Sequence, residues 1–210
     1  MSTLVPSRSG SASYVYDVVA VGASAGGLHS LGALIEAFPG SFRCPVLVVQ
    51  HLSPEYKSIF AEILGRGAGL PVQQAVDREK MHPGVVYVGP PAVHLVVEKG
   101  AIRLRSTPLV KFQRPSINML FESVAAEYGN HAIAVVLSGS GSDGADGTRN
   151  IKSAGGYTIA EDPATAGFNA MPKAAIATGC VDKVLESHEI GKLIFELCQL
   201  RQSLDPIAHG

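Results

Sequence analysis

Tryptophan and cysteine are scarce in this sequence, and their scarcity excludes several kinds of site. No tryptophan occurs, and aromatic residues make up 6% of the 210 residues, which argues against a surface that stacks single-stranded nucleic acid. The three cysteines, Cys44, Cys180 and Cys198, are far apart and form no C-x-x-C pair. This pattern argues against a disulfide framework and against a zinc knuckle. We expect Cys44 and Cys198, which adjoin apolar segments, to be buried or half-buried thiols.

The sequence also lacks a charge excess and a long apolar run. Its 17 Lys and Arg residues nearly balance its 18 Asp and Glu residues, so the net charge is -1. Such a balance gives no electrostatic reason to expect nucleic acid or an anionic membrane as a partner. No run approaches the roughly 18 apolar residues of a membrane-spanning helix, and residues 1–16 lack the apolar segment of a secretory signal. We therefore expect a cytoplasmic protein without membrane insertion.

Short apolar runs alternate along the chain with segments of helical periodicity. The apolar runs predict buried strands at residues 17–22, 45–50, 85–89, 132–137 and 156–160. Helices are predicted at residues 28–38, 59–64, 116–124, 144–154, 172–178 and 187–201. This order is typical of an α/β fold with a parallel sheet flanked by helices. Two further strands, 94–98 and 101–105, flank Lys99-Gly100 and are predicted to form an antiparallel β-hairpin.

The chain shows no repeat and no internal linker, so we expect one domain. It spans residues 17–201, between a flexible N-terminal tail at 1–16 and a C-terminal tail at 202–210. With 46% hydrophobic residues, a domain of this size can bury a large core.

Polar segments follow three of the predicted strands. Residues 22–27 read GASAGG, Gln50-His51 ends the second strand, and residues 138–144 read SGSGSDG. Because parallel strands point one way, their carboxyl ends lie at one edge of the sheet, where ligands bind. We expect Ser24, His51 and Asp143 to meet there despite their separation in sequence.

Ser24 stands in a G-x-S-x-G pattern between a predicted strand and a predicted helix. This is the nucleophile-elbow pattern, in which small neighbours allow a sharp turn that exposes the serine hydroxyl. A serine needs a base to become a nucleophile, and the base needs an acid to orient it. His51 and Asp143 supply these two residue types, so we predict a triad of Ser24, His51 and Asp143.

Each of these residues also has a simpler interpretation. Residues 22–27 could form a dinucleotide-binding loop, although Ser24 takes the middle glycine position and Gln50-His51 stands where an acidic residue is expected. His51 alone could be a surface or hydrogen-bonded histidine. Asp143 alone could be the N-cap of the helix that follows it.

The remaining titratable residues show no pattern of a site. The other histidines are scattered and lack metal-ligand spacing. We expect Glu161-Asp162 and the acidic residues of 186–189 to be solvated charges.

Several segments, taken in order, resemble one protein family. They include VAVGASAGG (19–27), VVQH (48–51), RPS (114–116), LSGSGSDGADG (137–147) and MPKAA (171–175). Together they resemble the catalytic domain of the chemotaxis protein-glutamate methylesterases of the CheB type. The similarity covers about residues 17–198, which is nearly the whole chain.

The resemblance implies a doubly wound, mainly parallel sheet with an antiparallel hairpin. It implies hydrolysis of glutamyl methyl esters on the cytoplasmic helices of chemoreceptors, with release of methanol, and often deamidation of receptor glutamine. The family's catalytic serine, histidine and aspartate fall on Ser24, His51 and Asp143. The backbone N–H groups of Ala25 and Ser140 would stabilise the oxyanion. Neither a metal nor a cofactor is implied.

The sequence departs from the family pattern at some positions. Members usually carry an N-terminal receiver domain, which residues 1–16 cannot hold, so we expect no phosphorylation control within this chain. Ala25, Asn118 and Ser140 stand where Thr, Asp and Met are common. These changes resemble a diverged branch, some of whose members sit beside methyltransferase or kinase modules, which are therefore expected partners.

Different classes of function remain open. The first is a methylesterase that acts on a methylated receptor. The second is a non-catalytic interaction module on the same scaffold. A third, weaker interpretation is a serine hydrolase or amidase with an unrelated substrate. The presence of all three triad residues favours the first.

Overall fold

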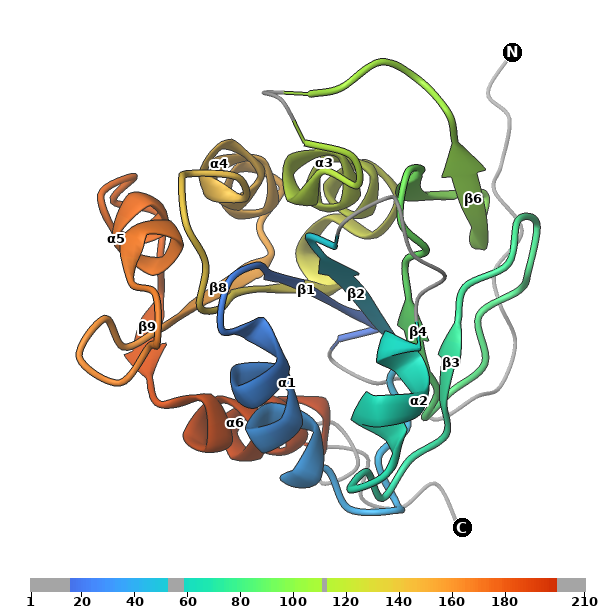
Figure 1. Ribbon diagram of the computed structural model, residues 1–210, viewed down its shortest axis with the longest axis horizontal. Coiled ribbons are helices and arrows are strands. Elements are labelled where there is room, and N and C mark those ends of the chain that lie inside the picture. The colour runs from blue at the N-terminus through green and yellow to red at the C-terminus, as the bar shows by residue number, and fades with distance from the viewer. Residues whose placement is uncertain (1–15, 53–58, 111–112, 200–210) are drawn as a thin grey trace, which may run out of the picture.

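A seven-stranded parallel sheet forms the centre of the protein (Figure 1). The computed structural model describes residues 16–52, 59–110 and 113–199. The strand order is β3-β4-β2-β1-β7-β8-β9. The bounds are β1 (Val18–Ala23), β2 (Val46–Gln50), β3 (Val72–Gln74), β4 (Val86–Val88), β7 (Ala132–Val136), β8 (Tyr157–Glu161) and β9 (Lys183–Leu185). All neighbouring strands in this sheet are parallel.

The chain leaves the central strands in opposite directions. From β1 it runs to β2 on one side, and from β7 it runs to β8 on the other. The carboxyl ends of β1 and β7 therefore flank the point where the strand order reverses. In open α/β sheets this is where a ligand-binding crevice forms.

Helices cover both faces of the sheet (Figure 1). One face carries α1 (Gly27–Glu36), α2 (Phe60–Gly65) and α6 (Ser187–Gln199), and the other carries α3 (Ile117–Tyr128), α4 (Ala145–Ser153) and α5 (Ala170–Ile176). A short 3₁₀ turn, η1 (Gly129–His131), follows α3. Val19 and Val21 of β1 pack in one core, whereas Val18 and Ala20 pack in the other. Because successive strand residues point to opposite faces, both layers require β1 to be apolar throughout.

The predicted hairpin forms a second, two-stranded sheet. Strands β5 (His94–Glu98) and β6 (Ala101–Arg105) are antiparallel, with Val96 opposite Arg103. Lys99 and Gly100 have φ values of 51° and 70°, as a two-residue turn of the left-handed type requires. The Val97 N–H donates to Ser123 Oγ at 3.0 Å, which ties the hairpin to α3.

The expected fold class is confirmed, and the structure adds two strands that were not predicted. These are β3 and β9, three residues each, at the two edges of the sheet. Their side chains are mostly exposed, so they lack the apolar run that marks a buried strand. Apart from Tyr16, the two predicted tails lie outside the described residues, and the domain bounds stay a prediction.

Two of the cysteines are buried, as expected. Cys44 is 1% exposed and Cys198 is 4% exposed, and their sulfur atoms lie 3.1 Å apart as free thiols. Within residues 16–52, 59–110 and 113–199, no helix has the length and apolar character needed to span a bilayer.

Candidate active site

Ser24 lies in a sharp turn between β1 and α1. Gly26 has a φ of 75°, a conformation that favours glycine, and the Ser24 carbonyl accepts the Gly27 N–H at 2.9 Å. A Cβ atom on Gly22 would lie 2.3 Å from the Ile117 side chain. Both glycines of the G-x-S-x-G pattern are therefore required, one for its φ angle and one for the close approach of α3.

The structure brings Ser24, His51 and Asp143 together in one hydrogen-bonded chain. His51 Nδ1 lies 3.2 Å from Ser24 Oγ, and His51 Nε2 lies 3.0 Å from Asp143 Oδ2. An ionised carboxylate can only accept, so Nε2 carries the proton that is donated to Asp143. The Nδ1 lone pair is thereby left to accept the Ser24 hydroxyl proton. The ring thus presents Nδ1 to the serine, whereas the serine-protease arrangement presents Nε2.

Asp143 is buried among hydrogen-bond donors from α3. It is 5% exposed, and it accepts the N–H groups of Ile117 at 2.7 Å and Asn118 at 3.0 Å, as well as the Ser116 hydroxyl at 3.2 Å. Burial acts to raise the pKa of Asp143, but the hydrogen bonds from His51, Ile117 and Asn118 outweigh it and lower the pKa below its ordinary value.

The interpretation of Asp143 as the N-cap of the following helix is wrong. The N-cap of α4 is Gly144, which has a φ of 97°. The Asp143 carboxylate instead caps α3, the helix that begins after Ser116. Ser116 is itself the expected N-cap of α3, since its Oγ accepts the Met119 N–H.

Asn118 fixes the loop that carries Asp143. Its Oδ1 atom accepts the N–H groups of Gly144 at 3.0 Å and Gly147 at 2.8 Å. The Asn118 side chain, which belongs to α3, thus provides an acceptor for N–H groups at the start of α4. Sequence reasoning noted Asn118 only as a departure from the family pattern, because its two partners lie far along the chain.

Gln50 connects the segments that carry Ser24 and His51. Its Nε2 donates to the Ser24 carbonyl at 2.7 Å and to the His51 carbonyl at 3.1 Å. Gln50 is 5% exposed. The sequence places Gln50 directly before His51, but the pattern predicts no role for its side chain.

Ala25 and Ser140 belong to the two backbone segments next to Ser24. Ala25 follows it in the turn, and the Ala25 carbonyl accepts the Ser138 hydroxyl at 2.8 Å. Ser140 follows Gly139, where an added Cβ atom would lie 2.8 Å from Ser24 Cβ. The backbone that leads to Ser140 therefore packs directly against the serine side chain. That these two N–H groups bind an oxyanion stays a prediction.

A cleft opens beside the Ser24 side chain. Its volume is about 620 Å³, and it is lined by Ser24, Gln50 and the apolar side chains of Leu28, Leu52 and Phe60. The exposed fraction of Leu28 is 44%. Two further large apolar residues are also exposed, Ile59 at 53% and Phe168 at 50%. A mainly apolar cleft beside a serine hydroxyl has room for an aliphatic side chain.

Comparison with known proteins identifies the family. The family model described as CheB methylesterase matches residues 19–194. The chain belongs to the CheB methylesterase family. The class of enzyme expected from the sequence, a hydrolase of carboxylic esters, is thereby confirmed.

Relatives within the CheB methylesterase family differ in length. A Leptospira interrogans protein is 35% identical over 185 residues, which cover 88% of this chain and 96% of that protein. The Anaeromyxobacter dehalogenans protein-glutamate methylesterase/protein-glutamine glutaminase 2 is 40% identical over 181 residues, which cover 86% of this chain and 53% of that protein. The chain thus spans nearly all of the first relative and about half of the second.

A solved structure of the family has the same fold. The Thermotoga maritima CheB methylesterase catalytic domain superposes with a TM-score of 0.83 at 34% sequence identity. The match covers 87% of this chain and 98% of that one.

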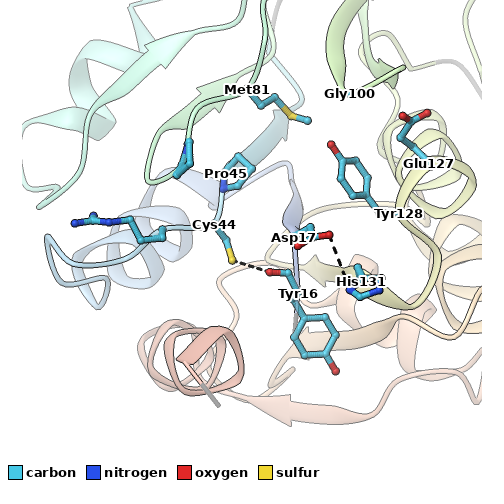
Figure 2. Close-up of a pocket in the computed structure, with 11 residues that line it drawn as sticks. Tyr16, Asp17, Cys44, Pro45, Met81, Gly100, Glu127, Tyr128 and His131 are labelled. Carbon is cyan, nitrogen blue, oxygen red and sulfur yellow. Dashed lines mark hydrogen bonds and ion pairs between the residues drawn. The ribbon is translucent and has the colours of Figure 1, made fainter. Parts of the chain in front are cut away.

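A second pocket lies at the amino-terminal ends of β1 and β2, and Figure 2 shows residues that line it. Its volume is about 470 Å³. It is lined by Asp17, which precedes β1, and by Cys44 and Pro45, which precede β2. Asp17 Oδ2 lies 3.9 Å from His131 Nδ1. Because ligands of parallel α/β sheets bind at the carboxyl ends of the strands, we take the cleft at Ser24 as the candidate active site.

One of the expected surface charges is buried. Glu161 is 2% exposed, so the prediction of a solvated charge is wrong for it, whereas Glu186 and Glu189 are exposed. Burial raises the pKa of Glu161, and hydrogen bonds from Ser138 and Ser30 oppose the rise. Glu161 ends β8, where the neighbouring segments after β7 and in α1 cover it.

Proposed function

We propose that this protein hydrolyses glutamyl methyl esters on chemoreceptor-type signalling proteins and releases methanol. The observation that carries the proposal is the hydrogen-bonded chain from Ser24 through His51 to Asp143. The family of the chain and the names of its relatives support the substrate class. The cleft beside Ser24 supplies room for the ester side chain.

The geometry of the triad supports the following reaction. Ser24 Oγ attacks the ester carbonyl carbon while His51 Nδ1 takes the hydroxyl proton. The protonated His51 then gives this proton to the leaving methoxide, which departs as methanol, and an acyl-enzyme remains. Water, deprotonated by His51, hydrolyses the acyl-enzyme and restores Ser24. Asp143 holds the imidazole ring in place and stabilises its positive charge.

The N–H groups of Ala25 and Ser140 complete the proposed site. They would bind the oxyanion that forms when the carbonyl carbon becomes tetrahedral. Both are backbone groups, so the Ala and Ser side chains at these positions leave this role intact.

The same residues can deamidate glutamine. An amide carbonyl is attacked in the same way, and His51 then protonates the amide nitrogen, which departs as ammonia. The Anaeromyxobacter dehalogenans relative is named for both activities.

We propose the cytoplasmic helices of a receptor as the substrate, the cytoplasm as the location, and a methyltransferase or kinase module as a partner.

A non-catalytic interaction module is the second candidate. The exposed apolar side chains of Leu28, Ile59 and Phe168 would suit a docking surface. Such a role does not require His51 and Asp143 to be aligned with Ser24, so we favour the enzyme.

Methanol release from methylated receptor membranes tests the proposal. The purified chain should release methanol, and the Ser24→Ala variant should not. A fluorophosphonate, which reacts with activated serines, should label the wild-type chain at Ser24. Labelling without methanol release would indicate a serine hydrolase with another substrate. The absence of both labelling and methanol release would indicate an interaction module.

A further inference from the structure

The carboxyl group of Glu161 joins two segments that flank the candidate active site. Its Oε1 accepts the Ser30 hydroxyl of α1 at 2.9 Å. Its Oε2 accepts the Ser138 N–H, after β7, at 2.7 Å. One buried side chain therefore connects the helix that follows Ser24 to the segment that leads to Ser140.

Ser138 extends this connection to the turn at Ser24. Its carbonyl accepts the Ser24 N–H at 2.9 Å. Its hydroxyl donates to the Ala25 carbonyl at 2.8 Å and accepts the Phe168 N–H at 2.9 Å. Ser138 is 0% exposed, so water does not replace these partners. A displacement of Ser138 would therefore be transmitted to both Ser24 and Ala25.

We propose that Glu161 is a positioning residue that sets the geometry of the oxyanion-binding N–H groups of Ala25 and Ser140. It acts through Ser30 and Ser138 and does not touch the substrate. The inference rests on the proposed roles of Ser24, Ala25 and Ser140. Displacement of catalytic groups by about 1 Å can lower a rate by about 10²-fold, so a support of this kind has a measurable effect.

The hydrogen-bonding capacity of the two partners indicates which replacements preserve this support. The Ser138 N–H can only donate, whereas the Ser30 hydroxyl can donate or accept. A glutamine can place its oxygen against Ser138 and its amide nitrogen against Ser30, which then accepts. A leucine of similar size can do neither. The proposal therefore separates Glu161→Gln from Glu161→Leu.

The test compares kcat and KM of these two variants with the wild-type chain. The substrates are a soluble peptide that carries a glutamate γ-methyl ester, and p-nitrophenyl acetate. Glu161→Leu should lower kcat by about 10- to 100-fold on both substrates, because the oxyanion contacts are weakened. Its KM should stay within about twofold, since the cleft residues are unchanged. Glu161→Gln should keep kcat within about threefold of the wild type, because both hydrogen bonds can form.

A matched control separates positioning from stability. Ile194, in α6, is 0% exposed, and Ile194→Ala should lower the melting temperature without a comparable loss of kcat below the melting transition. If this control loses as much kcat as Glu161→Leu, the effect is one of stability and the proposal is overturned. It is also overturned if Glu161→Leu keeps its kcat, or if Glu161→Gln is as impaired as Glu161→Leu.

A milder variant serves if Glu161→Leu does not fold. Ser30→Ala removes only the contact to α1, and kcat should fall several-fold at constant KM. An unchanged kcat overturns the proposal.

The two substrates distinguish this proposal from the proposed function. A wild-type chain that cleaves only p-nitrophenyl acetate contradicts the glutamyl ester as substrate, and the positioning effect is still measured on the aryl ester. If neither ester is cleaved, the rate of fluorophosphonate labelling at Ser24 provides the same comparison.

Discussion

The backbone N–H of Ile117 donates at 2.7 Å to the same Asp143 oxygen that accepts His51 Nε2. Ile117 is the first residue of α3, and the N-terminus of a helix favours a negative charge. One carboxylate oxygen thus connects the candidate base to the end of a core helix. The proposed catalysis and the packing of α3 are therefore coupled at Asp143.

Asp143→Asn should impair both turnover and stability. The amide can favour the wrong histidine tautomer, which lowers kcat by about 10⁴-fold in related triads. The amide nitrogen cannot accept, so the N–H of either Ile117 or Asn118 loses its partner, at a cost of about 1–3 kcal/mol. Methanol release and chemical denaturation measure the two effects. Asp146→Asn, on a surface pair with Arg149, should change neither.

The stability loss of Asp143→Asn should depend on pH. The pKa of Asp143 is lowered in the fold from an ordinary 3.8, so its contribution is full above that pH and is lost as the pH falls through the folded value. The difference in unfolding free energy between wild type and variant should therefore narrow below about pH 4. A difference that stays constant from neutral to acid pH would contradict the lowered pKa.

Ser24→Ala should abolish ester hydrolysis and leave the fold intact. The loss should be several orders of magnitude, about 10⁴-fold or more, because the nucleophile is removed. Ser24 lies in a turn that its backbone hydrogen bonds maintain, so the melting temperature should change little. Ser142→Ala, an exposed serine of the same loop as Asp143, is the matched control. Near-full turnover by Ser24→Ala would exclude Ser24 as the nucleophile.

His51→Gln should remove the acid limb of the pH profile. A protonated imidazole cannot accept the serine proton, so wild-type kcat/KM should fall as the pH is lowered. The variant should keep only a small residual activity, without that dependence. His82→Gln, at an exposed histidine, should retain the wild-type profile. If His51→Gln leaves kcat/KM unchanged, another residue is the base.

Gly22→Ala should destabilise the protein through a clash with α3. The added methyl group would lie 2.3 Å from the Ile117 side chain, and overpacking of this kind costs about 1–3 kcal/mol. The double variant Gly22→Ala/Ile117→Ala should be less destabilised than the sum of the two single variants, because the methyl group then has room. Additive free energies of unfolding in this cycle would show that Ile117 is not the obstacle.

The amino-acid sequence by itself was sufficient to predict the central strands, the hairpin and the meeting of Ser24, His51 and Asp143. These features depend on local patterns. An apolar run predicts a strand buried on both faces, and Lys99-Gly100 suits a two-residue turn. The convergence of the triad then follows from one geometric rule, that the carboxyl ends of parallel strands share an edge.

Only the tertiary structure decided what surrounds each charge and which helix each polar group serves. Glu161 is buried because α1 and the segment after β7 close over the end of β8, and Asp143 caps α3 because that helix begins beside the loop after β7. Asn118 likewise reaches α4 across a helix-helix contact, and the exposed edge strands β3 and β9 form only because a neighbouring strand is present to pair with them. Each of these features depends on residues distant in sequence. The solvation and hydrogen bonding of a side chain are properties of the packed neighbours, and a local sequence pattern does not contain them.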